Sequence, residues 1–220
     1  MVKRLVSSFS SEHGIYMMTV ISMAGLIMQI KKLDKAAPTK KAVSVFWMVT
    51  FTFSYLTGGI YGLSTIDSYG RPFLINGFLR APLGATICYQ LWTKNAITPK
   101  DRAWIKRYAI LVLYMISSPT ALGVIMNASV IAVTVSVGLV PWEIHKAGTR
   151  GRVSVTNLIT FLLGASFWLI YYLARLKVTI KTEEILELRF LALLSVLNMT
   201  SLALAIVLWL KSPPLAENSA

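Results

Sequence analysis

Four side chains in otherwise apolar stretches of this sequence have the chemistry to bind a polar molecule. Asn76 and Arg80 lie one helical turn apart, and Trp168 and Asn198 each lie within a later apolar stretch. An amide in an apolar environment needs a hydrogen-bond partner, and the hydroxyl groups of a solute in a cavity would supply one. An indole ring would pack on the C–H face of a sugar ring. Bonding between helices and ordinary core packing remain open as alternative roles.

The charge of Arg80 is the second unusual feature. Arg80 lies seven residues after Phe73, where its apolar stretch begins, so a helix would place it too deep for easy contact with water. None of the nine Asp and Glu residues lies in the middle of an apolar stretch. Two interpretations are open: backbone carbonyls and water satisfy the guanidinium group, or a ligand brings an anion such as a carboxylate.

The composition indicates which elements position these residues. The chain has 220 residues, of which 55% are apolar and 14% are charged, and its mean hydropathy is +0.64. These values are typical of a membrane protein, in which each helical span needs about 20 apolar residues. Seven apolar stretches of 16 to 22 residues come close to this length, at 15–30, 42–63, 73–92, 108–125, 127–142, 155–173 and 190–210. The sequence therefore predicts an all-α integral membrane protein with seven transmembrane helices.

One boundary between these spans is ambiguous. The segment 108–142 contains no charged residue over 35 positions, which is too long for one helix and barely enough for two. We predict a break near Met126, with Pro119 as a kink. A turn at 117–120 is the alternative, and it leaves the number of spans unchanged.

The distribution of Lys and Arg predicts the orientation of the chain. Fourteen of the 22 basic residues fall in segments on one side of the seven spans, and seven fall on the other side. The positive-inside rule then places the N-terminal segment 1–13 outside and the C-terminal tail 211–220 in the cytosol. We expect anionic lipid head groups, rather than nucleic acid, to be the partners of the net charge of +13.

The sequence lacks the residues that several kinds of chemistry require. Cys88 is the only cysteine, so we expect no disulfide framework and no cysteine-based metal site. Glu143 and His145 lie close together in the sequence but form no wider constellation of catalytic residues, and we predict no enzyme activity, metal or cofactor. The absence of carboxylates in the middle of the spans argues against a proton relay and favours uncoupled diffusion. The last span has no lysine for a retinal Schiff base.

A weak internal repeat relates the first three spans to the last three. The segment that begins at Gly25 is similar to the one at Gly138, with an offset of 113 residues. Asn76 pairs with Asn198 at an offset of 122, and the segment at Gly58 pairs with the one at Trp168 at an offset of 110. A second copy of a three-helix unit inserts in the same orientation only if one further span separates the copies. The predicted units are therefore a bundle at 14–93, a linker helix at 104–125 and a bundle at 126–210.

Taken together, these segments resemble the SWEET sugar transporters and the wider PQ-loop family. The similarity is carried by Pro141 and Trp142, by the basic loop 146–152, and by Trp168 with Tyr171 three residues later. It continues in the segment 75–77, with Asn76 at its centre, and in Asn198 with the leucine before it. The resemblance implies two three-helix bundles joined by an inversion linker helix, with a sugar bound between them by Asn76, Asn198 and Trp168.

The chain departs from the family pattern in three places. Met28 and Gln29 stand where the family has its first proline motif, and no glutamine follows Pro141. Gly58 stands where the first repeat would offer an aromatic or polar pocket residue. By resemblance, Pro141, Met28 and Gln29 belong to the hinges that close the cytosolic gate, although a passive kink at Pro141 remains an alternative.

These expectations combine into one functional hypothesis. The sequence predicts a facilitative, bidirectional transporter of a sugar or similar small polar solute, with Asn76, Asn198, Trp168, Gly58 and Arg80 at its binding site. One alternative is a carrier of an anionic or amino-acid-like solute that uses Arg80. Another is a receptor or structural subunit that keeps the fold without transport. A homo-oligomer is compatible with all three.

Overall fold

The structure is a computed structural model that describes residues 12–34, 45–64, 71–93, 99–118, 121–150, 153–177 and 182–214. Within these residues it contains seven helices of 19 to 30 residues and no strand. The helices are α2 (Glu12–Asp34), α3 (Val45–Ser64), α4 (Arg71–Thr93), α5 (Pro99–Ser117), α6 (Leu122–Ala147), α7 (Val155–Leu176) and α8 (Thr182–Lys211). Residues 1–11 of the predicted N-terminal segment, 35–44 of the first basic loop and 215–220 of the tail lie outside the described residues.

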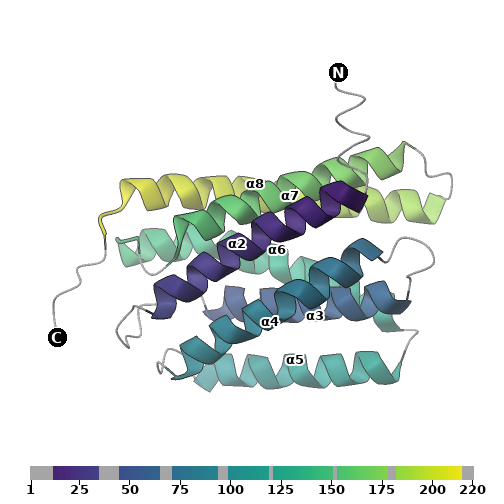
Figure 1. Ribbon diagram of the computed structural model, residues 1–220, viewed down its shortest axis with the longest axis horizontal. Coiled ribbons are helices and arrows are strands. Elements are labelled where there is room, and N and C mark those ends of the chain that lie inside the picture. The colour runs from purple at the N-terminus through teal and green to yellow at the C-terminus, as the bar shows by residue number, and fades with distance from the viewer. Residues whose placement is uncertain are drawn as a thin grey trace.

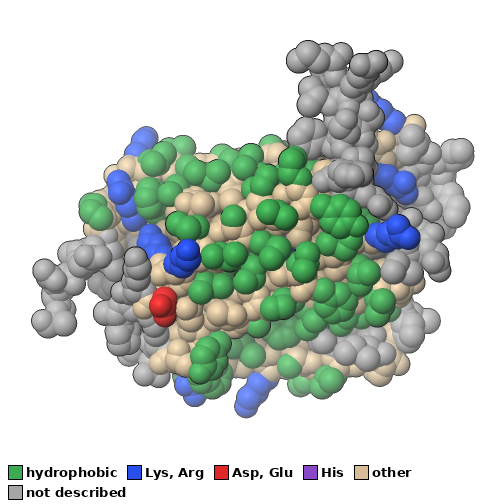
Figure 2. Space-filling view, in the orientation of Figure 1, with side chains coloured by type: hydrophobic (Ala, Val, Ile, Leu, Met, Phe, Trp, Pro, Cys, Tyr) green, Lys and Arg blue, Asp and Glu red, His purple; other side chains and the backbone are tan. Residues whose placement is uncertain are grey.

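The all-helical prediction is confirmed for the described residues. Six predicted spans each overlap one helix, whereas the span 108–125 overlaps α5 and the start of α6. The helices run roughly along the long axis of the molecule (Figure 1). Among the described residues, three segments are long and apolar enough to cross a membrane, namely α6, α7 and Ile185–Lys211 of α8. Apolar side chains cover the middle of the face in Figure 2, and Lys and Arg lie mainly toward its ends and lower edge. These features indicate a membrane protein.

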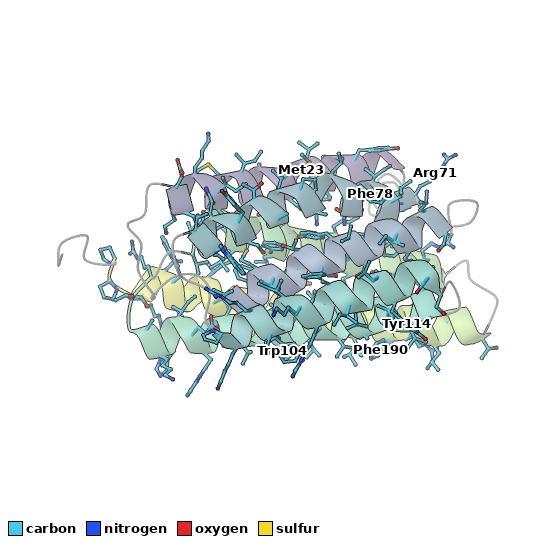
Figure 3. All side chains as sticks on the ribbon, turned by 90° about the horizontal axis from the view of Figure 1, so that it is seen from below. Met23, Arg71, Phe78, Trp104, Tyr114 and Phe190 are labelled. Carbon is cyan, nitrogen blue, oxygen red and sulfur yellow. The ribbon has the colours of Figure 1, made fainter. Side chains whose placement is uncertain are left out.

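Six of the helices contact one another in a ring, in the order α2, α4, α3, α6, α8, α7 and back to α2. For description we divide this ring into two groups of three that follow the predicted repeats. In the first triplet (α2, α3 and α4), α4 contacts both α2 and α3; in the second triplet (α6, α7 and α8), α8 contacts both α6 and α7. Between the triplets, α2 packs on α7 and α3 packs on α6. The remaining helix, α5, contacts α3 and α6 (Figures 1 and 3).

Glycine allows α3 and α4 to approach unusually closely. A Cβ atom on Gly77 of α4 would overlap the backbone of Tyr55 and Gly59 in α3. Small residues at such contacts allow helix backbones to touch, which is a common way of packing helices in membranes. The contact positions the turn of α4 that carries Asn76 and Arg80 against Tyr55.

The break between the fourth and fifth predicted spans differs from its expected place. α5 ends at Ser117 and α6 begins at Leu122, so the break lies at the alternative turn 117–120 and not near Met126. A proline disfavours helical geometry in the residue before it, and Pro119 follows Ser118. α5 also begins earlier than the predicted span 108–125, at Pro99. Its first turns are basic, and for this reason hydropathy did not include them in the span.

Candidate functional site

A cavity of about 140 Å³ lies between the two triplets. All six helices of the triplets contribute to its lining, and no described residue of α5 does. The five residues predicted to bind solute all line this cavity, although they come from four different helices: Gly58, Asn76, Arg80, Trp168 and Asn198. Folding therefore brings together residues that are up to 140 positions apart in the sequence.

Arg80 is buried in the wall of the cavity, with 5% of its surface exposed. Its Nη2 donates to the backbone oxygen of Met18 in α2 at 3.3 Å, and its guanidinium carbon lies 5.2 Å from the centre of the Tyr55 ring. Its Nε has no hydrogen-bond partner among the described residues. Arg80 is also the only charged residue among the described residues that line the cavity. The site thus presents an uncompensated positive charge.

The two asparagines have different surroundings. Asn76 is buried, and its Oδ1 accepts a hydrogen bond of 3.3 Å from the Thr19 hydroxyl of α2. This bond links two helices of one triplet. Bonding between helices is the alternative role that the sequence left open for Asn76. Asn198 is partly buried, and its Oδ1 has no partner in the part of the chain that the structure describes. The Asn198 carbonyl is therefore an acceptor available to a solute.

Trp168 belongs to a stack of aromatic rings. Its ring is nearly parallel to Phe73, with centroids 5.3 Å apart and planes at 16°, and to Tyr172, at 5.7 Å and 24°. Because Phe73 lies on α4, this stack joins the two triplets. Phe73 and Tyr172 also line a second cavity of about 50 Å³, which Arg175 and Glu187 border. The aromatic stack therefore lies where the two cavities meet.

A different set of contacts joins the triplets at the opposite end, where α2 and α8 end and α7 begins. We call it the closing cluster: Gln29, Lys32, Arg150, Val153, Ser154 and Trp209. Gln29 is fully buried, and its Oε1 accepts a 2.8 Å hydrogen bond from the backbone N–H of Ser154. The Val153 carbonyl accepts from Lys32 Nζ at 2.8 Å and from Trp209 Nε1 at 3.0 Å.

Trp209 also lies close to two cations in the closing cluster. Lys32 Nζ is 5.6 Å and the Arg150 guanidinium carbon is 4.6 Å from the indole ring. Arg150 Nε further donates to the carbonyl of Ser212 at 2.8 Å. Burial, and secondarily the charge of Arg150, lowers the pKa of Lys32. The indole ring offsets part of the electrostatic repulsion between the two cations. Hydrogen bonds and cation–π contacts thus join the triplets at this end.

Between the closing cluster and the cavity, α3 and α7 meet through aromatic side chains. The rings of Phe51 and Phe161 are 4.4 Å apart at 62°, and Trp47 lies 5.4 Å from Phe161. Phe51 and Phe161 have the same offset of 110 residues as Gly58 and Trp168. Equivalent positions of the two predicted repeats are therefore in direct contact.

The three predicted gate residues are placed differently. Gln29 connects the triplets, as described above. Met28 is 45% exposed and lines neither cavity. Pro141 is buried, and α6 continues through it to Ala147. Of the three, Gln29 is the one with a side-chain hydrogen bond between the triplets among the described residues.

Three residues at or near the site were missed by the sequence reasoning. Tyr55 and Phe73 line the cavity, but aromatic residues in apolar spans give no signal that separates them from core residues. Asn157, close to the start of α7, is fully buried, and neither of its amide atoms has a hydrogen-bond partner among the described residues. An asparagine in an apolar stretch was the signal used for Asn76, and the same signal was present for Asn157.

The described residues contain no group of three His, Cys, Asp or Glu side chains able to hold a metal ion. Comparison with known proteins finds no matching family model, no matching curated protein and no matching solved structure. The resemblance to the SWEET and PQ-loop proteins therefore stays a prediction, and a function must be argued from the cavity itself.

Proposed function

We propose that this protein is a facilitative membrane carrier that binds a small polar solute in the cavity between its triplets. The observation that carries the proposal is the cavity itself: helices of both triplets line it, and its lining includes two asparagines and an arginine. Transporters built from repeats commonly bind substrate at such a repeat interface, near the middle of the bilayer.

The arrangement we propose is seven membrane spans, with α5 as an inversion linker between the triplets. The support is the symmetry of the helix contacts. If α2, α3 and α4 correspond to α6, α7 and α8, the contacts of α4 within its triplet match those of α8, and the α2–α7 contact matches the α3–α6 contact. The excess of basic residues then places the end with the closing cluster in the cytosol and the N-terminus outside.

Transport would follow from a rocking motion of one triplet against the other. In this conformation the closing cluster seals the cytosolic end, whereas the aromatic stack of Phe73, Trp168 and Tyr172 separates the cavity from the outer side. Opening the cytosolic end requires breaking the Gln29–Ser154 bond, and opening the outer end requires separating Phe73 from Trp168. No acidic residue lines the described part of the cavity, which favours uncoupled diffusion in both directions.

The size of the cavity limits the solute. A cavity of about 150 Å³ in another protein accepts benzene, so 140 Å³ suits a ring or chain of similar size and excludes a disaccharide in this conformation. A sugar-like solute is the choice that the family resemblance suggests. A small anion bound to Arg80 is the alternative that the charge of the cavity suggests, and a receptor without transport is the remaining one.

Uptake of labelled solutes into liposomes that contain the purified protein tests the proposal. We expect solute exchange that saturates and that falls about tenfold in Asn198→Ala, as for the loss of one or two hydrogen bonds to the solute. Thr200→Ala is the matched control, because Thr200 is exposed on the same helix and its hydroxyl donates to the backbone oxygen of Val196 in that helix. If no class of solute exchanges faster than in empty liposomes, the carrier proposal fails and the receptor alternative remains.

A further inference from the structure

We propose that the solute is a small monocarboxylate that also carries a hydroxyl group, and that Arg80 binds its carboxylate. This inference rests on the proposed carrier function, and it names the class of solute that the cavity takes. It depends on the charge, the hydrogen-bonding groups and the volume of the cavity.

The first argument is charge. Arg80 has 5% of its surface exposed, and a buried guanidinium group is stable only if its charge is offset. The Met18 carbonyl and the Tyr55 ring offset part of it, but both are neutral, and the Nε–H group has no partner among the described residues. A carboxylate in the cavity supplies the missing charge and accepts hydrogen bonds from the planar guanidinium group.

The second argument is the set of groups around Arg80. Asn76 lies one turn away on α4, and because its Oδ1 accepts from Thr19, its Nδ2 is the part that can donate to a carboxylate. The free Oδ1 of Asn198 requires a donor, which the hydroxyl group supplies. An amino-acid zwitterion fits less well, because its ammonium group would find no carboxylate in the described lining and would be repelled by Arg80. The volume of about 140 Å³ suits about six non-hydrogen atoms.

The experiment compares four labelled probes in proteoliposomes: lactate, propionate, alanine and glucose. We expect lactate to exchange fastest, propionate to be slower because it lacks the hydroxyl, and alanine and glucose to be slower still. Arg80→Gln should reduce lactate exchange about 10- to 100-fold, as for a lost hydrogen bond to a charged group, and Arg80→Lys should reduce it less. Arg107→Gln, on the exposed side of α5, is the matched control and should exchange lactate like the unchanged protein.

The membrane potential gives an independent readout. Uncoupled entry of a monoanion moves net charge, so a potential that is positive inside the liposome should accelerate net lactate uptake, whereas it should leave glucose uptake unchanged. Wild-type exchange of glucose without lactate, or an Arg80→Gln variant that exchanges lactate normally, overturns the inference and leaves the carrier function standing.

Binding separates failure of the inference from failure of the carrier function. If no probe is exchanged, the carrier function fails, and thermal unfolding of the detergent-solubilised protein with lactate or glucose decides the inference. Stabilisation by lactate that Arg80→Gln abolishes and Arg107→Gln retains supports an anion site. Equal midpoints with and without lactate overturn it. The same melts without ligand show whether Arg80→Gln folds; if it does not, Arg80→Lys takes its place in both assays.

Discussion

At the scale of single residues, the two ends of the cavity are closed by different chemistry. Gln29 in the closing cluster makes a directed hydrogen bond to the backbone of Ser154, the residue that precedes α7. Phe73 and Trp168 at the opposite end of the cavity make ring contacts with each other, which have no fixed hydrogen-bond geometry. The contact at the closing cluster is therefore the more specific of the two, and one side chain controls much of it.

The first prediction concerns Gln29. Replacing it by leucine keeps the approximate volume but leaves the buried N–H of Ser154 without its acceptor, at a cost of about 1–3 kcal/mol. We expect Gln29→Leu to unfold at a lower temperature in detergent than the unchanged protein. Met28→Leu is the control, because Met28 is exposed and neighbours Gln29 in sequence. Equal melting temperatures for Gln29→Leu and Met28→Leu would show that the bond does not hold the triplets together.

The residues at the cavity were only partly predictable from the sequence. Asn76, Arg80 and Asn198 stand out because polar groups are rare in apolar stretches, and the structure places all three in one cavity. Whether they bind solute stays a prediction. Tyr55 and Phe73 could not be singled out, because their roles depend on which helix faces them, and a single sequence holds no information on such contacts between distant segments.

At the scale of helices, close backbone contact determines where the site residues lie. Gly77 is the clearest case, since the backbone of α3 occupies the space that its side chain would need. Gly25 is a second case, because a Cβ there would overlap the side chain of Thr160, which lies across the contact between α2 and α7. One contact is within a triplet and the other is between triplets, so they have different consequences for stability and for motion.

The second prediction concerns Gly77. In Gly77→Ala the added methyl group forces α3 and α4 apart, because backbone atoms cannot move aside as a flexible side chain can, and overpacking of this kind costs about 1–3 kcal/mol. Gly138→Ala is the control, since its nearest neighbour would be the Ser201 hydroxyl oxygen at 4.0 Å and alanine favours a helix. We expect thermal unfolding to begin earlier in Gly77→Ala and no earlier in Gly138→Ala. An unchanged midpoint in Gly77→Ala would mean that α3 and α4 can separate at no cost.

Helix existence was easier to predict than helix limits. Long apolar stretches need helices in a membrane, so all seven helices were expected, and each overlaps its predicted span. The limits of α5 and α6 were missed because hydropathy changes little between Tyr108 and Trp142. A proline disfavours a helical conformation in the residue before it, so Pro119 was the better sequence signal for the break. α5 also begins in a basic segment that hydropathy assigns to a loop.

At the scale of the whole molecule, the helix contacts follow the same pattern in the two triplets. The sequence repeat is weak, yet Phe51 and Phe161 occupy equivalent positions of the predicted repeats and touch. Under the proposed function, one triplet rocks against the other without large changes inside either. This motion requires that all seven helices cross the membrane, including α4 and α5, whose charged residues make them less apolar than α6, α7 and α8.

The last prediction tests this requirement. Because Cys88 is the only cysteine, a Cys88→Ala background allows single cysteines to be placed at exposed helix ends and labelled with a membrane-impermeant maleimide. Seven spans predict that cysteines at three positions, 100, 146 and 211, react only from the cytosolic side, and that cysteines at positions 71 and 177 react only from the outside. The pair at 71 and 100 is the most informative, because α4 lies between them and carries Arg80. Labelling of both from one side would show that α4 does not span the membrane, and the cavity would then lack one wall of a transmembrane pathway.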